Sequence, residues 1–225
     1  MKQAGTQRAN QTIWGERIAA LRLEDLMSAV QEHDKIRSVI LKKYAEVSRS
    51  AIGKFTYLTG IEGARALEYD ESVLSRMSNE LFKSFCGVGN PFQGGLISRG
   101  ESLLDVGCGS GIDLLVASQY IGETGRVCGV DITPQMRELA EINVRSAGLK
   151  NVEVREGSAE SIPYEDNAFD IVISNGVLNL STQKELAFLE IFRVLAPGGR
   201  LQFADIILEG EKSRETPCTL EAWSD

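Results

Sequence analysis

Residues 103–113 read LLDVGCGSGID, an apolar run that leads through three alternating glycines into a second apolar run. The first run predicts a buried strand, and a predicted helix begins at Ile112. Glycine has no Cβ, so Gly107, Gly109 and Gly111 can take positive φ angles and let a ligand lie against the backbone. The helix that follows presents free N–H groups and the positive end of its dipole. This order predicts a nucleotide-binding loop in an α/β domain, although glycines alone are also typical of an ordinary strand-to-helix turn.

A second predicted strand, residues 125–131, ends in the carboxylate of Asp131. Doubly wound folds place an acidic residue about 20 residues after the glycine turn, where it binds ribose hydroxyls. A short carboxylate there can accept hydrogen bonds from both hydroxyls, and it repels a 2′-phosphate. Asp131 therefore predicts nucleoside binding. Its alternative role, capping the helix that begins at Pro134, suits Thr133 better because Thr133 directly precedes the proline.

The spacing of the glycines separates two classes of cofactor. It is G-x-G-x-G, whereas the dinucleotide fingerprint has its third glycine one residue later, where this chain has Ile112. That difference disfavours a nicotinamide-dependent oxidoreductase. With these motifs the chain resembles the class I S-adenosylmethionine-dependent methyltransferases. The resemblance implies that Asp105 lies near the methionine amino group of S-adenosylmethionine.

The resemblance extends over most of the second half of the chain. A third predicted strand at residues 151–157 precedes Ser158, Ala159 and Glu160, which the resemblance places beside the adenine. A fourth strand is expected at residues 169–175, and residues 193–201 resemble the turn before a fifth, which a helix stop and tight turn also explain. The implied S-adenosylmethionine site consists of Asp105, Gly107, Cys108, Gly109, Ser110, Gly111, Asp131, Ile132, Ser158, Ala159 and Asn175.

Composition is that of an ordinary globular protein. The chain has 225 residues, of which 43% are hydrophobic and 25% charged, and its formal net charge is -8. An acidic chain without a basic run disfavours nucleic acid as a partner, and no apolar stretch is long enough to span a membrane. The polar N-terminus predicts a cytoplasmic location. The four cysteines have no paired spacing, which predicts free thiols, and no metal site is expected.

The sequence divides near Gly100. Apolar residues recur at helical spacing around residues 13–30 and again around residues 36–44, and residues 72–85 also predict a helix. We therefore expect a helical cap or extension at residues 1–100. Residues 101–225 are expected to form an S-adenosylmethionine-binding α/β domain, doubly wound, with a mostly parallel Rossmann-like sheet and helices on both faces.

The end of the chain raises a question about the sheet edge. In the fold that the resemblance implies, two more strands follow the fifth, whereas only residues 206–225 remain here. We expect these strands of the usual fold to be missing. The N-terminal helices or a second subunit would then cover the edge, because an open apolar edge invites pairing. A possible homodimer is therefore one expectation for this chain.

Within the class, the chain resembles the arsenite methyltransferase-like group. The resemblance is carried by SNGVLNL at residues 174–180, by GNP at residues 89–91 and by Trp223. Trivalent arsenic is soft and needs thiolates. This chain has Val88 and Gly176 where the group has cysteine, so arsenite is the weaker alternative, with Cys86 and Cys218 as a rearranged thiol pair.

The residues nearest the acceptor are expected at the ends of the fourth and fifth strands. Asn175, Asn179 and Asp205 are the candidates for the acceptor pocket, and Asn179 is equally placed to cap a following helix. The expected activity is methyl transfer to a small-molecule acceptor by in-line displacement, in which positioning supplies much of the rate. The alternative is a protein that binds S-adenosylmethionine without turnover, such as a partner subunit.

Overall fold

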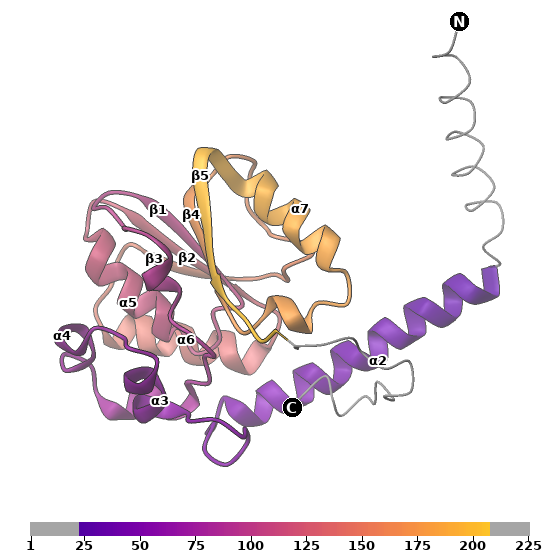
Figure 1. Ribbon diagram of the computed structural model, residues 1–225, viewed down its shortest axis with the longest axis horizontal. Coiled ribbons are helices and arrows are strands. Elements are labelled where there is room, and N and C mark those ends of the chain that lie inside the picture. The colour runs from indigo at the N-terminus through magenta and orange to yellow at the C-terminus, as the bar shows by residue number, and fades with distance from the viewer. Residues whose placement is uncertain (1–22, 208–225) are drawn as a thin grey trace, which may run out of the picture. The chain divides into compact units, whose positions relative to one another are not determined.

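The computed structural model describes residues 23–207 and shows one five-stranded parallel sheet (Figure 1). The strands are β1 (Ser102–Val106), β2 (Arg126–Asp131), β3 (Val152–Glu156), β4 (Phe169–Asn175) and β5 (Leu195–Ala204). Their order is β3-β2-β1-β4-β5, so the chain changes its direction of winding between β1 and β4. Loops leave the two strands in opposite directions at such a point, and a crevice forms between them. The predicted doubly wound parallel sheet is confirmed.

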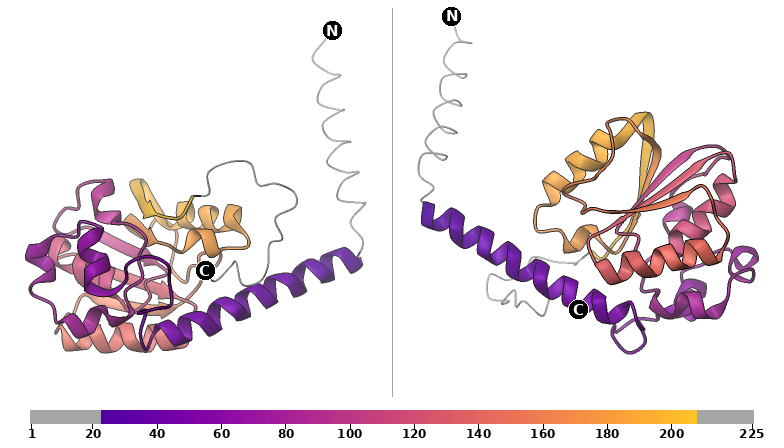
Figure 2. Two further views of the ribbon diagram at one scale, coloured as in Figure 1. Left: turned by 60° about the horizontal axis from the view of Figure 1, so that its bottom comes forward. Right: turned by 180° about the vertical axis from the view of Figure 1, so that it is seen from behind.

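Helices cover both faces of the sheet, which lies between α7 (Lys184–Val194) and α5 (Ile112–Ile121) (Figure 2). Leu104 points to one face and packs in a cluster with Ile191 of α7. Its neighbour Leu103 points to the other face and packs with Leu114 of α5. Helix α6 (Pro134–Ser146) lies along β2 and β3. Because both faces are buried, the central strands are apolar at successive positions rather than at alternate ones.

The elements before the sheet differ from those that the sequence pattern predicts. They are α2 (Leu23–Val47), α3 (Gly60–Ala66), α4 (Glu71–Leu74), η1 (Asn79–Ser84) and η2 (Pro91–Gly94). The single helix predicted at residues 72–85 is wrong, because Ser78 is extended and its hydroxyl accepts a hydrogen bond from the N–H of Glu80, which starts a new helix. Within the described residues, the apolar positions from Val30 to Tyr44 lie on α2 alone. Those at Ile13, Ile18 and Leu21 lie outside the described part.

The turn predicted before the fifth strand lies instead within β5, where it is an irregularity in the pairing with β4. Leu195 pairs with Phe169, but the next pair joins Arg200 to Ile171, so residues 196–199 bulge out of the register. Gly198 has a φ of 85°, which a glycine adopts without strain. Short η3 (Leu178–Leu180) follows β4.

Of the described residues, 23–38 belong to one unit and 39–207 to a second, compact one. The site described below belongs entirely to the second unit. The boundary predicted near residue 100 stays a prediction. Cys218 and Trp223 lie outside the described residues, as do residues 208–225 of the segment on which the expectation of missing strands rests. No described helix has both the length and the apolar character needed to cross a bilayer.

Candidate functional site

A pocket opens at the carboxyl ends of β1, β2 and β4, where the winding direction changes. Its cavity volume is about 140 Å³. Most of the predicted cofactor residues line it, namely Asp105, Gly107, Cys108, Gly109, Ser110, Asp131, Ile132, Ser158, Ala159 and Asn175. The structure therefore brings together residues from β1, β2 and β4, from the loops after β1 and β2, and from the loop after β3.

The three glycines of the loop after β1 have left-handed backbones with different surroundings. Their φ values are 77° at Gly107, 51° at Gly109 and 82° at Gly111. A Cβ at Gly107 would lie 2.4 Å from Cγ2 of Val177, and one at Gly111 would lie 3.1 Å from Cβ of Ala140. A Cβ at Gly109 would meet no atom within 4 Å. Close packing thus requires two of the glycines, whereas Gly109 leaves room beside the pocket.

The carboxylate of Asp131 is held by the backbone on both sides. Its Oδ2 accepts a hydrogen bond from the N–H of Gly109 at 2.9 Å, and its Oδ1 accepts one from the N–H of Thr133 at 2.8 Å. Thr133 occupies the N-cap position of α6, but its side chain forms no capping hydrogen bond. Burial raises the pKa of Asp131, and the hydrogen bonds from Thr133 and Gly109 oppose that shift. Each oxygen keeps a lone pair for a further donor.

Two more carboxyl groups are buried beside Asp131. Asp105 forms no hydrogen bond through its side chain with any described residue, and burial raises its pKa well above the usual range, with the charges of Asp113 and Asp131 adding to the effect. Burial raises the pKa of Asp113 to about 6, against the lowering effect of hydrogen bonds from Tyr69 and Asn175. Buried acceptors of this kind favour a ligand that brings N–H or O–H donors or a positive charge.

Asn175, the last residue of β4, binds a loop that is distant from it in the sequence. Its Oδ1 accepts hydrogen bonds from the N–H groups of Val88 at 2.9 Å and Gly89 at 3.2 Å. Its Nδ2 donates to Oδ2 of Asp113 at 3.2 Å and to the hydroxyl of Tyr69 at 3.0 Å. That hydroxyl in turn donates to Oδ1 of Asp113 at 2.8 Å. Asn175 lines the pocket, and its side chain is already engaged by the protein.

The other two candidates for the acceptor pocket lie elsewhere. Oδ2 of Asp205 accepts a hydrogen bond from the N–H of Asn179 at 2.9 Å, so the structure brings this pair together. Neither residue lines the pocket. Asn179 lies in η3 and does not cap α7, whose N-cap residue is Gln183.

Several lining residues come from the part of the chain before the sheet, which contains none of the predicted cofactor residues. Tyr44 of α2 and Cys86 both line the pocket. Burial raises the pKa of the Tyr44 hydroxyl well above its usual value, and burial together with the charge of Asp131 raises the pKa of Cys86 to about 12. Tyr44 belongs to an apolar helical pattern, which gives no sign of a binding role.

The two positions that distinguish the chain from the arsenite methyltransferase-like group are neighbours. A Cβ at Gly176 would lie 3.2 Å from Cγ1 of Val88. The place therefore holds a valine side chain beside a glycine rather than a pair of thiols. Cys108 and Cys128 are buried and free.

Comparisons with known proteins agree with this geometry. The chain matches the model of a family described as a methyltransferase domain over residues 97–224. An arsenite methyltransferase of Halobacterium salinarum is 32% identical over 197 residues, which cover 81% of this chain and 50% of the relative. The ubiquinone/menaquinone biosynthesis C-methyltransferase UbiE of Salmonella arizonae is 41% identical over 118 residues, or 50% of this chain and 47% of the relative.

A solved structure is also similar. The crystal structure of CrArsM, an arsenic(III) S-adenosylmethionine methyltransferase from Chlamydomonas reinhardtii, has a TM-score of 0.54 and 39% sequence identity, and the match covers 60% of this chain and 47% of that one. The chain spans about half the length of these relatives.

Proposed function

This chain belongs to the methyltransferase domain family, and from that membership we propose that it binds S-adenosylmethionine in the pocket between β1, β2 and β4. The observation that carries the proposal is the open space at Gly109 beside the held carboxylate of Asp131. When bound, the cofactor supplies a methyl group activated by a sulfonium ion.

The residues present fit this cofactor. S-adenosylmethionine has no phosphate, so the glycine loop need only pass close to its ribose and methionine parts. Asp131 retains lone pairs for the ribose hydroxyls, and the buried carboxyl of Asp105 is an acceptor for the methionine amino group. Ser158 and Ala159 line the same pocket and are proposed to lie beside the adenine.

The rest of the pocket would position a small-molecule acceptor. Ile40, Met136 and Leu180 contribute apolar walls, which exclude water from the site. Holding two reactants in a fixed geometry turns a bimolecular step into one that is effectively unimolecular, and this supplies much of the rate. The proposed activity is therefore methyl transfer to a small organic acceptor.

Arsenite is the second candidate acceptor. The names of two relatives favour it, and Cys86 lines the pocket. Against it stand the valine and glycine at positions 88 and 176 and the raised pKa of Cys86, which keeps that thiol protonated near neutral pH. Methyl transfer to arsenite in the presence of a thiol, abolished by Cys86→Ser, would establish arsenite as the acceptor.

Calorimetric titration tests the cofactor proposal. We expect S-adenosylmethionine and S-adenosylhomocysteine to bind, NAD not to bind, and Asp131→Asn to weaken adenosyl binding by about tenfold through loss of a charged acceptor. Binding of NAD alone would overturn the proposal. Binding of S-adenosylmethionine without transfer to any of a panel of acceptors would favour the alternative, a partner subunit without turnover.

We further propose that the protein is a cytoplasmic homodimer that uses neither nucleic acid nor a membrane. Support for the dimer comes from exposed apolar side chains on α7 and at the end of the chain's described part, namely Phe188, Leu189, Phe192, Phe203 and Ile207. Light scattering coupled to size exclusion gives the mass in solution and tests the dimer directly.

A further inference from the structure

The loop between β3 and β4 reaches from the pocket to α7. Its first part, Ser158 and Ala159, lines the pocket. Ser158 and Ser161 exchange two backbone hydrogen bonds, from N to O at 3.2 Å and 3.1 Å, which close a tight turn. After this turn the backbone of Ile162 has no strand beside it, so its polar groups need other partners.

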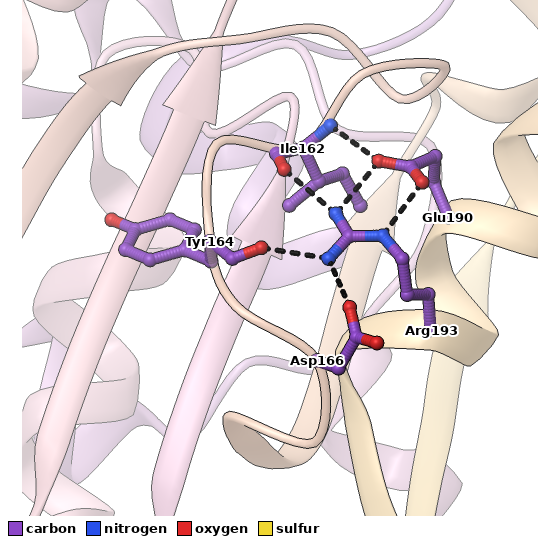
Figure 3. A network of polar contacts seen from close by, with 5 residues as sticks. All are labelled: Ile162, Tyr164, Asp166, Glu190 and Arg193. Carbon is purple, nitrogen blue, oxygen red and sulfur yellow. Dashed lines mark hydrogen bonds and ion pairs between the residues drawn. The ribbon is translucent and has the colours of Figure 1, made fainter.

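Two side chains of α7 supply those partners (Figure 3). Oε2 of Glu190 accepts a hydrogen bond from the N–H of Ile162 at 2.9 Å. Nη2 of Arg193 donates to the carbonyl oxygen of the same residue at 2.9 Å, and Nη1 donates to the carbonyl oxygen of Tyr164 at 2.8 Å. Glu190 and Arg193 therefore hold Ile162 by both sides of its backbone.

Every N–H donor of the Arg193 guanidinium group forms a hydrogen bond. Nε and Nη2 of Arg193 each donate to Glu190, at 2.7 Å and 2.8 Å, and Nη1 also donates to Asp166 at 2.9 Å. With the two carbonyl bonds this engages all five of its N–H donors. The side chains of Glu190 and Arg193 are 19% and 30% exposed, so water competes only in part for these bonds. A lysine has three donors without a planar fork and cannot form this set.

We propose that Glu190 and Arg193 are positioning residues that fix Ser158 and Ala159 for the adenine end of the cofactor. The inference rests on the proposed function, since it assigns the loop to S-adenosylmethionine. Neither side chain lines the pocket, so both act through the backbone of Ile162. If the loop leaves this position for part of the time, the apparent affinity falls by the fraction of molecules that remain competent.

The test uses the full chain with Arg193→Met and Arg193→Lys, and with Arg145→Met as the matched control. Arg145 also pairs with a glutamate on its own helix, at 3.3 Å, but its side chain is 66% exposed. Titrations with S-adenosylhomocysteine and with S-inosylhomocysteine, whose base carries an oxygen in place of the adenine amino group, measure affinity and base discrimination. Amide hydrogen exchange at residues 158–164 measures whether the loop is held.

We expect Arg193→Met to speed exchange in the loop, to weaken S-adenosylhomocysteine binding by about tenfold and to reduce the preference for adenine over inosine. Arg193→Lys should give exchange rates, affinity and base preference between those of this variant and of wild type. If Arg193→Met does not fold, Arg193→Lys is the variant that tests the inference. Arg145→Met should match wild type, as expected for an exposed ion pair.

If the wild-type protein binds the adenosyl ligands, two results would overturn this inference and leave the proposed function intact. One is unchanged exchange at residues 158–164 in both Arg193 variants, and the other is faster exchange with unchanged affinity and discrimination. Wild-type protein that binds neither adenosyl ligand would overturn the proposed function, and this inference with it.

Discussion

At the scale of single residues, alanine substitutions at two glycines can distinguish the effect of backbone strain from the effect of blocking the pocket. Gly109 and Gly148 have φ values of 51° and 70°, and a Cβ at either would meet no atom within 4 Å. An alanine in this conformation costs roughly 1–2 kcal/mol. We expect Gly109→Ala and Gly148→Ala to lose similar unfolding free energies in urea.

Only Gly109 lines the pocket, so only Gly109→Ala should also weaken S-adenosylmethionine binding in calorimetry. Equal affinities in the two variants would show that the space at Gly109 does not receive the ligand.

The buried carboxyl of Asp105 predicts a dependence of stability on pH. Its pKa is raised in the folded protein, so the folded state holds the proton at pH values where the unfolded chain has released it. Stability from this group is therefore lost as pH rises from the ordinary carboxyl range toward the raised pKa. Asp105→Asn removes the buried charge, and we expect it to stabilise the ligand-free protein by about 1–3 kcal/mol at pH 8 and much less at pH 4.

Urea unfolding at the two pH values measures this difference. Glu123→Gln removes the same charge from an exposed position and should change stability little at either pH. An equal change in the unfolding free energy of Asp105→Asn at pH 4 and at pH 8 would contradict the electrostatic explanation.

The sequence predicts the residues of the site that belong to local motifs. Asp131 follows from its place at the end of a strand, and the glycine loop follows from its spacing. Tyr44 could not be found in this way, because only the folded chain brings α2 to the pocket, and Cys86 is predicted only as one member of a rearranged thiol pair. Asn179 and Asp205 are predicted to line the acceptor pocket because they follow the ends of two strands. They lie close to each other, but neither lines the pocket.

At the scale of elements, Tyr69 connects the loop around Gly89 to α5 and β4. Its hydroxyl bonds to Asp113 and to Asn175, at 2.8 Å and 3.0 Å. Tyr69→Phe removes a hydrogen bond from a buried carboxyl, so we expect a loss of about 1–3 kcal/mol in unfolding free energy at pH 8. The loss should shrink below pH 6, where Asp113 takes up its proton, since its pKa is about 6.

Tyr120→Phe is the matched control for this change. Its ring packs against Phe92, as does that of Tyr69, but its hydroxyl forms no hydrogen bond with a described residue. We expect this variant to unfold like wild type. Equal losses in the two variants would assign the effect to the loss of a hydroxyl group in general and not to the hydrogen bonds of Tyr69.

The strands were more predictable than the helices that precede them. Apolar runs bounded by glycine or by charged residues mark β1, β2 and β4 within a residue or two, because burial on both faces leaves a strong signal. Residues 72–85 have a helical apolar pattern, yet the local hydrogen bond of Ser78 divides them into α4 and η1. Competition between a serine hydroxyl and the helix backbone is a local effect that periodicity does not report.

At the scale of the whole molecule, the exposed apolar face of α7 predicts association. Leu189 and Phe192 are 63% and 78% exposed, and the nearby ring of Phe188 packs on Phe203 at 6.2 Å between centroids. We expect Leu189→Lys combined with Phe192→Lys to lower the mass measured by light scattering. Stability should remain within about 1 kcal/mol of wild type, since both sites are solvated.

Leu58→Lys provides the comparison, because Leu58 is also 63% exposed but lies apart from this face in the segment before α3. It should leave the mass of the particle unchanged. A similar decrease in both proteins would point to net charge, and not to the face of α7, as the cause.

The strand order also has a consequence for how the protein is made. β1 ends at Val106 and pairs on one side with β4, which begins at Phe169. Roughly 60 residues separate them, and a ribosome that adds about 5–20 residues per second needs about 3–12 s to make that length. The central strand of the sheet therefore spends seconds of each synthesis cycle with one edge bare, at the stage when a nascent chain is most exposed to wrong pairing and most open to a chaperone.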